Sequence, residues 1–126
     1  MVNSDVLFFF DGHMEALPLY EAFAAQIEQF GDVTVRVQKT QITFSNRHNF
    51  VFVSFLPARK AKDRPKNYIT VTFGLDNRVD SPRIDIATEP YPNRWTHHVL
   101  ISSAEEIDKE LMGWVKEAYD FSSGKR

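Results

Sequence analysis

Two adjacent histidines, His97 and His98, are the side chains of this sequence with the widest chemical range. An imidazole can bind a metal ion, act as a general base, or pair with an anion. Arg94 lies just upstream of the pair, and Ser102 and Ser103 follow it. Neither H-x-H nor H-x-x-x-H occurs in the 126 residues, so the common short zinc-ligand spacings are absent. The element that carries the histidines must therefore decide what they can do.

The segment WTHHVLI, residues 95–101, predicts a β-strand. Successive side chains of a strand point to opposite faces. One face then carries Trp95, His97, Val99 and Ile101, and the other carries Thr96, His98 and Leu100. We expect one histidine to face the core, where it needs a hydrogen-bond partner, and the other to face the open side. Both can be purely structural; a functional histidine would be the one that shares the open face with Arg94.

The two serines have a simpler explanation than a serine–histidine pair. Each of Ser102 and Ser103 is followed three residues later by a glutamate, which is the spacing of a helix capping box. Apolar residues then recur at helical spacing, so a helix is expected over residues 102–121. Gly113 within it suggests close packing against a neighbour, because alanine would favour the helix more.

The rest of the chain predicts an α+β fold. An amphipathic helix is expected over residues 17–30, with Pro18 near its start and Gly31 just past its end. Alternating or continuous apolar runs predict strands at residues 33–38, 41–45, 50–56, 68–73, 83–88 and 95–101, and a proline pair should end the fifth. We expect an antiparallel meander of five to six strands, with the N-terminal and C-terminal helices packed on one face. The strand at 50–56 is apolar on both faces and should be covered on both sides.

Length and composition are typical of a single domain over residues 1–126, with residues 1–5 and 122–126 expected to fray. The hydrophobic fraction of 43% is sufficient for a core. Cysteine is absent, which excludes disulfides and thiolate chemistry and suits a cytoplasmic protein. The apolar run VLFFF is too short for a signal sequence or a membrane span, so we expect no membrane association.

Charge is distributed unevenly along the chain, although the net charge is only −2. Residues 1–32 hold six acids and no lysine or arginine, whereas residues 33–68 hold eight bases and one acid. The conservative interpretation is a solvated basic loop. The sharper one is an anion-binding surface, for which the candidates are Arg36, Lys39, Arg59, Lys60, Lys62, Arg64, Arg94, His97 and His98. If strand alternation continues to Lys39, its side chain lies at the rim of the core or reaches into a cleft there.

Enzymatic motifs and cofactor sites are not expected. The five glycines are scattered, so no phosphate-binding loop exists, and no G-x-S-x-G nucleophile elbow occurs. Asp85 and Glu89 lack the E-x-K of a metal nuclease. We therefore expect a small non-catalytic binding module whose basic sheet and loop hold an anionic ligand or nucleic acid. An alternative is a protein-interaction domain with an apolar patch beside Phe50, Phe52 and Tyr68.

The overall pattern resembles a widespread bacterial family of domains of unknown function. The similar segments are LYEAFAAQIEQFGDVTVRVQKTQITF, the following NF, and HHVLISSAEEIDKELMGWVKEAYDF. The resemblance implies a helix–sheet–helix layout and carries no known reaction. By fold analogy alone the element order is also similar to frataxin-like domains, which implies, as a further alternative, a cation or iron site at Glu21, Glu28 and Asp32.

Overall fold

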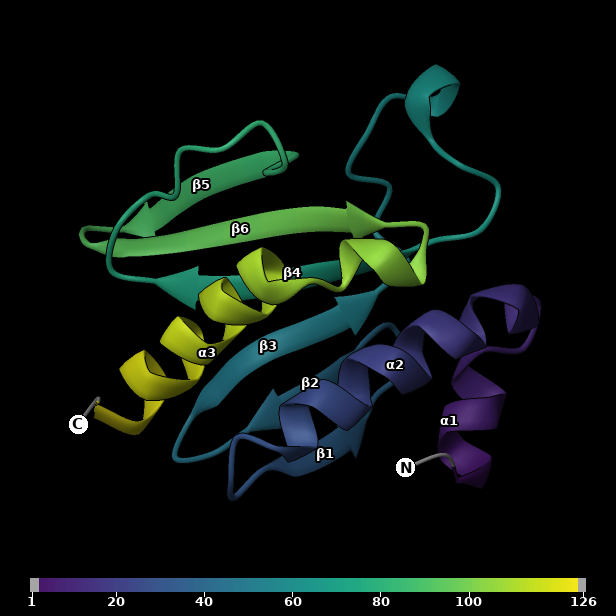
Figure 1. Cartoon of the computed structure of the whole chain (residues 1–126), viewed down its shortest axis with the longest axis horizontal. Coiled ribbons are helices and arrows are strands. Elements are labelled where there is room, and N and C mark those ends of the chain that lie inside the picture. Colours follow the sequence, from purple (N-terminus) through teal and green to yellow (C-terminus); the bar gives the residue numbers. More distant parts are fainter. Residues whose placement is uncertain (1–2, 125–126) are drawn as a thin grey trace.

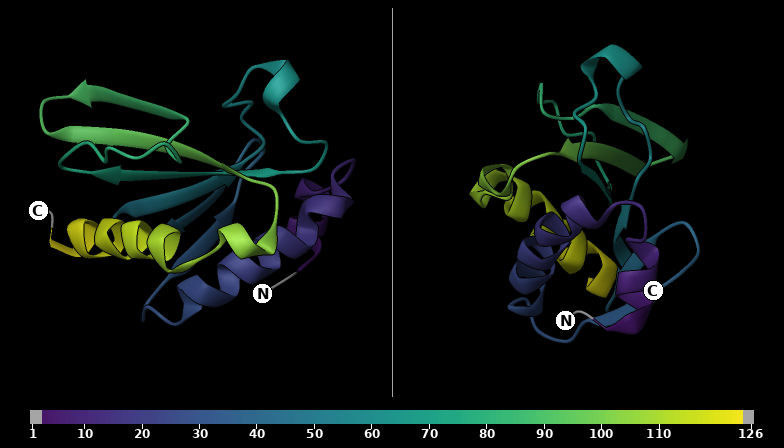
Figure 2. Two further views of the ribbon diagram at one scale, coloured as in Figure 1. Left: turned by 45° about the horizontal axis from the view of Figure 1, so that its top comes forward. Right: turned by 90° about the vertical axis from the view of Figure 1, so that its right-hand side faces the viewer.

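The computed structural model describes residues 3–124 as an α+β fold with a six-stranded antiparallel sheet, which confirms the expected class (Figure 1). The helices are α1 Ser4–Phe9, α2 Leu17–Glu28 and α3 Lys109–Gly124, with short 3₁₀ turns η1 Met14–Ala16, η2 Ala61–Asp63 and η3 Ala104–Glu106. The strands are β1 Thr34–Val37, β2 Ile42–Ser45, β3 Asn49–Ser54, β4 Ile69–Leu75, β5 Ile86–Tyr91 and β6 Arg94–Ile101. Figure 2 shows α2 and α3 on one face of the sheet.

The strand order is β1-β2-β3-β4-β6-β5, so the expected meander is wrong at its last step. β6 pairs with β4 and β5 on its two sides, and β5 forms the edge. The polar sequence IATEPY explains this order, because none of its residues is buried, whereas four of the last five residues of β6 are. The more apolar strand takes the interior position, where the core covers it.

The edge position of β5 also explains why Pro90 does not end it. Of the predicted proline pair, Pro90 lies inside β5, and the strand ends at Tyr91, directly before Pro92. The register shifts between Thr88 and Tyr91, and an edge strand at a bulge tolerates a residue without an N–H. Asn93, with φ of 61°, then closes the turn into β6. The predicted start of the strand at Arg83 is wrong, since β5 begins at Ile86.

One continuous hydrophobic cluster fills the space between the sheet and the helices. Phe23 of α2 meets Phe44 of β2 edge to face, with ring centroids 6.1 Å apart, and Leu111 of α3 is fully buried. β3 is interior as expected, but it is covered completely on one side only. Val51 and Val53 are buried against the helices, while Phe52 on the other side is half-buried.

Of the ends expected to fray, residues 4–5 and 122–124 are helical, and residues 1, 2, 125 and 126 lie outside the described residues. α1 begins at Ser4, and Ser122 near the end of α3 is buried with its Oγ 2.7 Å from Asn46 Oδ1. The predicted capping box forms at Ser103 with Glu106, although it caps η3, and α3 itself begins only at Lys109.

Gly31 and Gly113 differ in backbone conformation and in the space available for a Cβ atom, so alanine at each should change stability in opposite directions. Gly31 has φ of 131°, and a Cβ there would meet Tyr119 Oη at 3.0 Å, whereas a Cβ at Gly113 meets nothing within 4 Å. The expected close packing at Gly113 is therefore wrong. We predict that Gly31→Ala lowers the free energy of unfolding by about 1–3 kcal/mol, and that Gly113→Ala raises it by up to about 1 kcal/mol. Urea unfolding measures both free energies. Equal effects of the two substitutions would contradict the conclusion that Gly31 requires glycine and Gly113 does not.

Candidate functional site

One row of side chains crosses the face of the sheet that is turned away from α2 and α3, called here the open face. Strand pairing connects Arg36, Thr43, Phe52, Thr72, His98 and Ile86 in register across all six strands. His98 therefore lies on the open face, and His97 lies on the helix side, where it is fully buried. The alternation expected for the two histidines is confirmed by this register.

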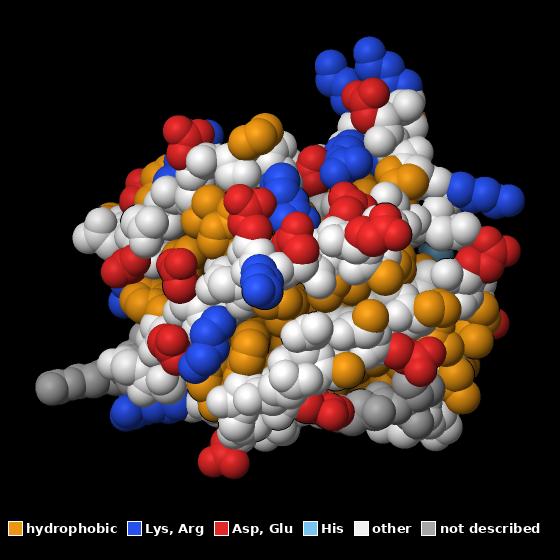
Figure 3. Space-filling model, viewed as in Figure 1, with side chains coloured by type: hydrophobic (Ala, Val, Ile, Leu, Met, Phe, Trp, Pro, Cys, Tyr) orange, Lys and Arg blue, Asp and Glu red, His pale blue; other side chains and the backbone are white. Residues whose placement is uncertain are grey.

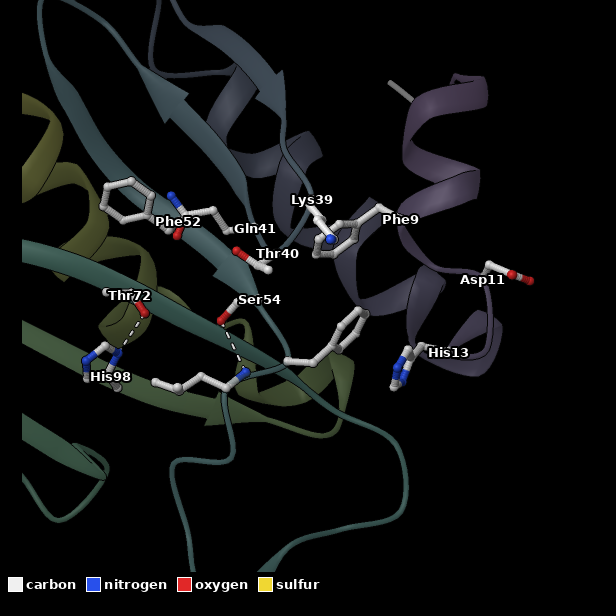
Figure 4. A pocket seen from close by; sticks show the side chains of 12 residues that line it. Phe9, Asp11, His13, Lys39, Thr40, Gln41, Phe52, Ser54, Thr72 and His98 are labelled. Carbon is white, nitrogen blue, oxygen red and sulfur yellow. Dashed lines mark hydrogen bonds between the residues drawn. The ribbon is translucent and has the colours of Figure 1, made fainter.

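A cavity of about 730 Å³, called here the main cavity, opens on this face (Figure 4). Its floor comes from strands β3, β4 and β6, and its walls come from the β1–β2 turn, the segment after β3, and the segment around the end of α1. The lining side chains are Phe9, Asp11, His13, Lys39, Thr40, Gln41, Phe52, Ser54, Phe55, Leu56, Thr72 and His98.

Three stacked rings build one wall of the main cavity. The ring of Phe55 lies 5.1 Å from that of Phe9 and 4.0 Å from that of His13, and the planes differ by only 19° and 17°. Stacked rings with little rotamer freedom make a stiff apolar surface. This wall depends on α1, because Val6 and Phe10 anchor that helix in the core.

The opposite side of the main cavity carries a hydrogen-bonded imidazole. His98 Nδ1 lies 2.8 Å from Thr72 Oγ1 on the neighbouring strand. Burial lowers the pKa of His98 below its ordinary value of 6.5, so the ring is neutral at pH 7. Its Nε2 makes no hydrogen bond to any of residues 3–124. His98 can therefore give or accept one hydrogen bond to a ligand, but supplies no charge at neutral pH.

Lys39 supplies the positive charge at the main cavity. β1 ends at Val37, so Lys39 lies in the turn rather than continuing the strand. Of the two predicted positions for Lys39, the rim of the core and a cleft beside it, the structure shows a cleft. This cleft lies on the open face and not beside the core. Within the part of the chain that the structure describes, Lys39 has no ion pair or hydrogen bond. Asp11, the acid of the lining, points away from the cavity and from Lys39 (Figure 4).

The remaining predicted bases do not converge on this cavity. Arg94 lines a second cavity of about 390 Å³, and Arg36 is exposed on β1. Three more, Lys60, Lys62 and Arg64, belong to the loop between β3 and β4, which projects from the body with its basic tip outward (Figure 3).

Arg59 is bound in a structural contact. Its Nε lies 2.8 Å from Asp85 Oδ1, and its Nη2 donates to the carbonyl of Leu100 at 3.3 Å. Asp85 Oδ2 in turn accepts the backbone N–H of Leu100 at 2.8 Å. Arg59 and Asp85 together hydrogen-bond to the backbone of Leu100 in β6, beyond the point where β5 begins. Neither side chain is therefore free for a ligand.

His97 has a structural role. Its Nε2 accepts the backbone N–H of Val79 at 2.9 Å, and its ring stacks on Phe73 at 4.9 Å. Burial lowers the pKa of His97. The ring therefore stays neutral, with Nε2 as an acceptor. Its hydrogen bond to Val79 holds the β4–β5 connection against the core.

The geometry supports neither the alternative cation site on acidic side chains nor the alternative apolar patch for a protein partner. Glu21, Glu28 and Asp32 are exposed, and among residues 3–124 no three His, Cys, Asp or Glu side chains are grouped to hold a metal ion. The expected patch beside Phe50, Phe52 and Tyr68 is not exposed, because Phe50 is buried and the other two are half-buried. The large exposed apolar side chains lie elsewhere and are Leu7, Phe8, Met14, Leu56, Ile86 and Tyr91.

Several lining residues could not be identified from the sequence. Phe9 and His13 belong to a segment that reads only as an apolar run before the first long helix, although the run of three phenylalanines was an available signal. Thr72 lies between the apolar Val71 and Phe73 in the sequence, and its contact with His98 depends on which strands are neighbours.

The chain was compared with known families, curated proteins and solved structures. No helix within the described residues is long and apolar enough to cross a membrane. Comparison with curated proteins gave no match, and comparison with solved structures gave none either. Residues 8–122 match the profile of a domain of unknown function, DUF5655. This match spans most of the chain and includes both walls and the floor of the main cavity, so the protein belongs to the DUF5655 family.

Proposed function

We propose that this protein is a small binding module that holds an amphipathic organic anion in the main cavity. The observation that carries the proposal is the convergence of Lys39, the stacked rings and the His98–Thr72 pair on one uncovered sheet face. Ligand sites are typically concave and mostly apolar, with a few polar groups that orient the ligand. The cytoplasm is the proposed location, since a chain without cysteine needs no oxidising compartment.

Each part of the main cavity suits one part of such a ligand. Lys39 lacks a partner among the described residues, so it can pair with a carboxylate, sulfonate or phosphate. Phe52 and Phe55 can contact an apolar or aromatic body. The free Nε2 of His98 can hydrogen-bond a polar substituent.

A small anion suits these residues better than nucleic acid does. Non-specific binding of single strands uses a continuous positive groove with stacking aromatic side chains. Here Arg59 is paired with Asp85, and the lysines of the β3–β4 loop lie outside both cavities. Lys39 and Arg94 are then the cations left on the two cavity walls, and two separate cations do not make a continuous positive groove.

A pair of fluorescent dyes tests the proposal. Anilinonaphthalene sulfonate carries an anionic group, and N-phenyl-1-naphthylamine has a similar ring system without it. We expect the sulfonate to bind more tightly to the wild-type protein. Lys39→Met should weaken the sulfonate about tenfold, equivalent to ~1.4 kcal/mol, and leave the neutral dye unchanged, as measured by fluorescence titration.

The matched control is Lys62→Met, which removes a lysine of the projecting loop that lines neither cavity. It should leave the affinity of both dyes unchanged. If Lys39→Met binds the sulfonate as tightly as the wild-type protein, the main cavity does not select an anion through Lys39 and the proposal is wrong.

A further inference from the structure

The second cavity adjoins the main cavity along the open face. Phe52 and Thr72 line both of them, so the two hollows meet over the middle of β3 and β4. The second cavity continues over Gly74 and Thr96 to Arg94 at the start of β6. Together they run diagonally across the sheet, from the β1–β2 turn to the β5–β6 turn.

Gly74 leaves the floor of the second cavity bare. It follows Thr72 on the open face of β4 and pairs with Thr96. A Cβ at this position would have one neighbour within 4 Å, the carbonyl oxygen of Trp95 at 3.7 Å, which is an ordinary contact. The backbone would therefore accept a side chain here. A glycine inside a strand weakens the strand and often marks a place where a ligand approaches the backbone closely.

Arg94 gives the far end of the second cavity a positive charge. Its guanidinium lies over the ring of Phe121, 5.2 Å from the ring centroid, and Nη1 donates to the carbonyl of Asn93 at 3.0 Å. No acidic side chain among residues 3–124 forms an ion pair with it. Most of its donors remain available, and a guanidinium pairs well with a carboxylate or phosphate.

The two unpaired cations stand at opposite ends of the joined cavities. Lys39 lies two residues beyond Val37, whose register continues through the sheet to Val99, and Arg94 precedes Val99 by five residues. With ordinary strand rise and spacing, their Cα atoms lie on the order of 25 Å apart. No ligand with a single short body can contact both.

We propose that the ligand is an elongated organic dianion, with an apolar middle and one acidic group at each end. This inference rests on the proposed function, because Lys39 binds one acidic group in both. Phe52 and Thr72 lie under the middle of the ligand, Gly74 lets it approach β4, and Arg94 binds its second acidic group. The second acidic group then binds at high effective concentration once the first is held.

Calorimetric titration of fatty acids against diacids of equal chain length tests the inference. The wild-type protein is expected to bind hexadecanedioate about tenfold more tightly than hexadecanoate, and hexanedioate should have no such advantage over hexanoate. Arg94→Met should abolish the advantage of the long diacid and change the affinity for hexadecanoate less than twofold. Gly74→Val, which fills the floor of the second cavity under the body of either long acid, should weaken hexadecanoate and hexadecanedioate and leave hexanoate unchanged.

Two controls keep the outcomes separate. Arg78→Met removes an exposed arginine that lines neither cavity and should keep the diacid advantage. Lys39→Met should weaken both long acids. If hexadecanoate binds through Lys39 but the diacid binds no tighter, the two-ended ligand is wrong and the proposed function stands. If neither acid binds and the anionic dye shows no dependence on Lys39, the proposed function itself is wrong.

Discussion

Replacing Asp85 with alanine is expected to lower the free energy of unfolding by about 2–4 kcal/mol. β5 pairs with β6 only as far as Ile86 opposite His98, so the end of β6 has no strand on that side. Asp85 takes the place of that strand. Its backbone N–H donates to the carbonyl of His98 at 2.9 Å, and its carboxylate accepts from Leu100 and Arg59. Alanine leaves the N–H of Leu100 without an acceptor and a half-buried guanidinium without its counter-charge.

Urea unfolding at neutral pH measures this effect, with two comparison variants. Asp85→Asn keeps an acceptor for Leu100 and loses the charge, so its loss should be intermediate. Asp120→Ala breaks the exposed Lys116–Asp120 pair and should cost less than about 0.5 kcal/mol. An effect of Asp85→Ala as small as that of Asp120→Ala would show that the contacts of Asp85 with Arg59 and Leu100 do not stabilise β6.

Replacing His97 with alanine is expected to cost about 2–4 kcal/mol at pH 8. The substitution removes a fully buried ring stacked on Phe73 and leaves the N–H of Val79 without an acceptor. His97→Gln should lose less, because an amide oxygen can accept the same N–H. Urea unfolding ranks the three proteins, and equal stabilities of the two variants would contradict the hydrogen bond to Val79.

The same histidine makes stability depend on pH. Burial lowers the pKa of His97 from its ordinary value of 6.5, so the unfolded chain takes up the proton at higher pH than the folded protein does. Stability is therefore full above about pH 6.5 and is lost as the pH falls below it. His98 contributes in the same direction. Unfolding at pH 8 and pH 5 should show a smaller loss in His97→Gln than in the wild-type protein.

The exposed imidazole of His13 provides the control for this pH effect. His13→Ala should retain the acid sensitivity of the wild-type protein. If His97→Gln loses as much stability on acidification as the wild-type protein does, the buried imidazole is not the group that takes up the proton.

The sequence predicted those features that depend on local periodicity. The helix around Phe23 and the alternation of His97 with His98 follow from neighbours a few residues apart, because helix and strand periods turn fixed positions toward fixed faces. The α+β class follows from the same patterns. The anion candidates were found by type alone, and of them Lys39, Arg94 and His98 line the two cavities of the open face.

Strand order and the partners of charged groups depend on contacts between distant segments. β6 lies between β4 and β5 because its burial is greater, and this comparison requires the whole sheet. Arg59 is bound to Asp85, 26 residues away, and so is unavailable to a ligand. Phe9 joins the cavity wall only because α1 packs its neighbours Val6 and Phe10 into the core.

The two adjacent histidines show both what the sequence determined by itself and what only the tertiary structure decided. Backbone geometry alone places them on opposite faces, since every strand alternates its side chains. Which face is covered depends on where α2 and α3 pack, and that is a free-energy balance over the whole core. Packing therefore buried His97 on the helix side of the sheet and left His98 beside Thr72 on the open face, within the cavity that Lys39 also lines.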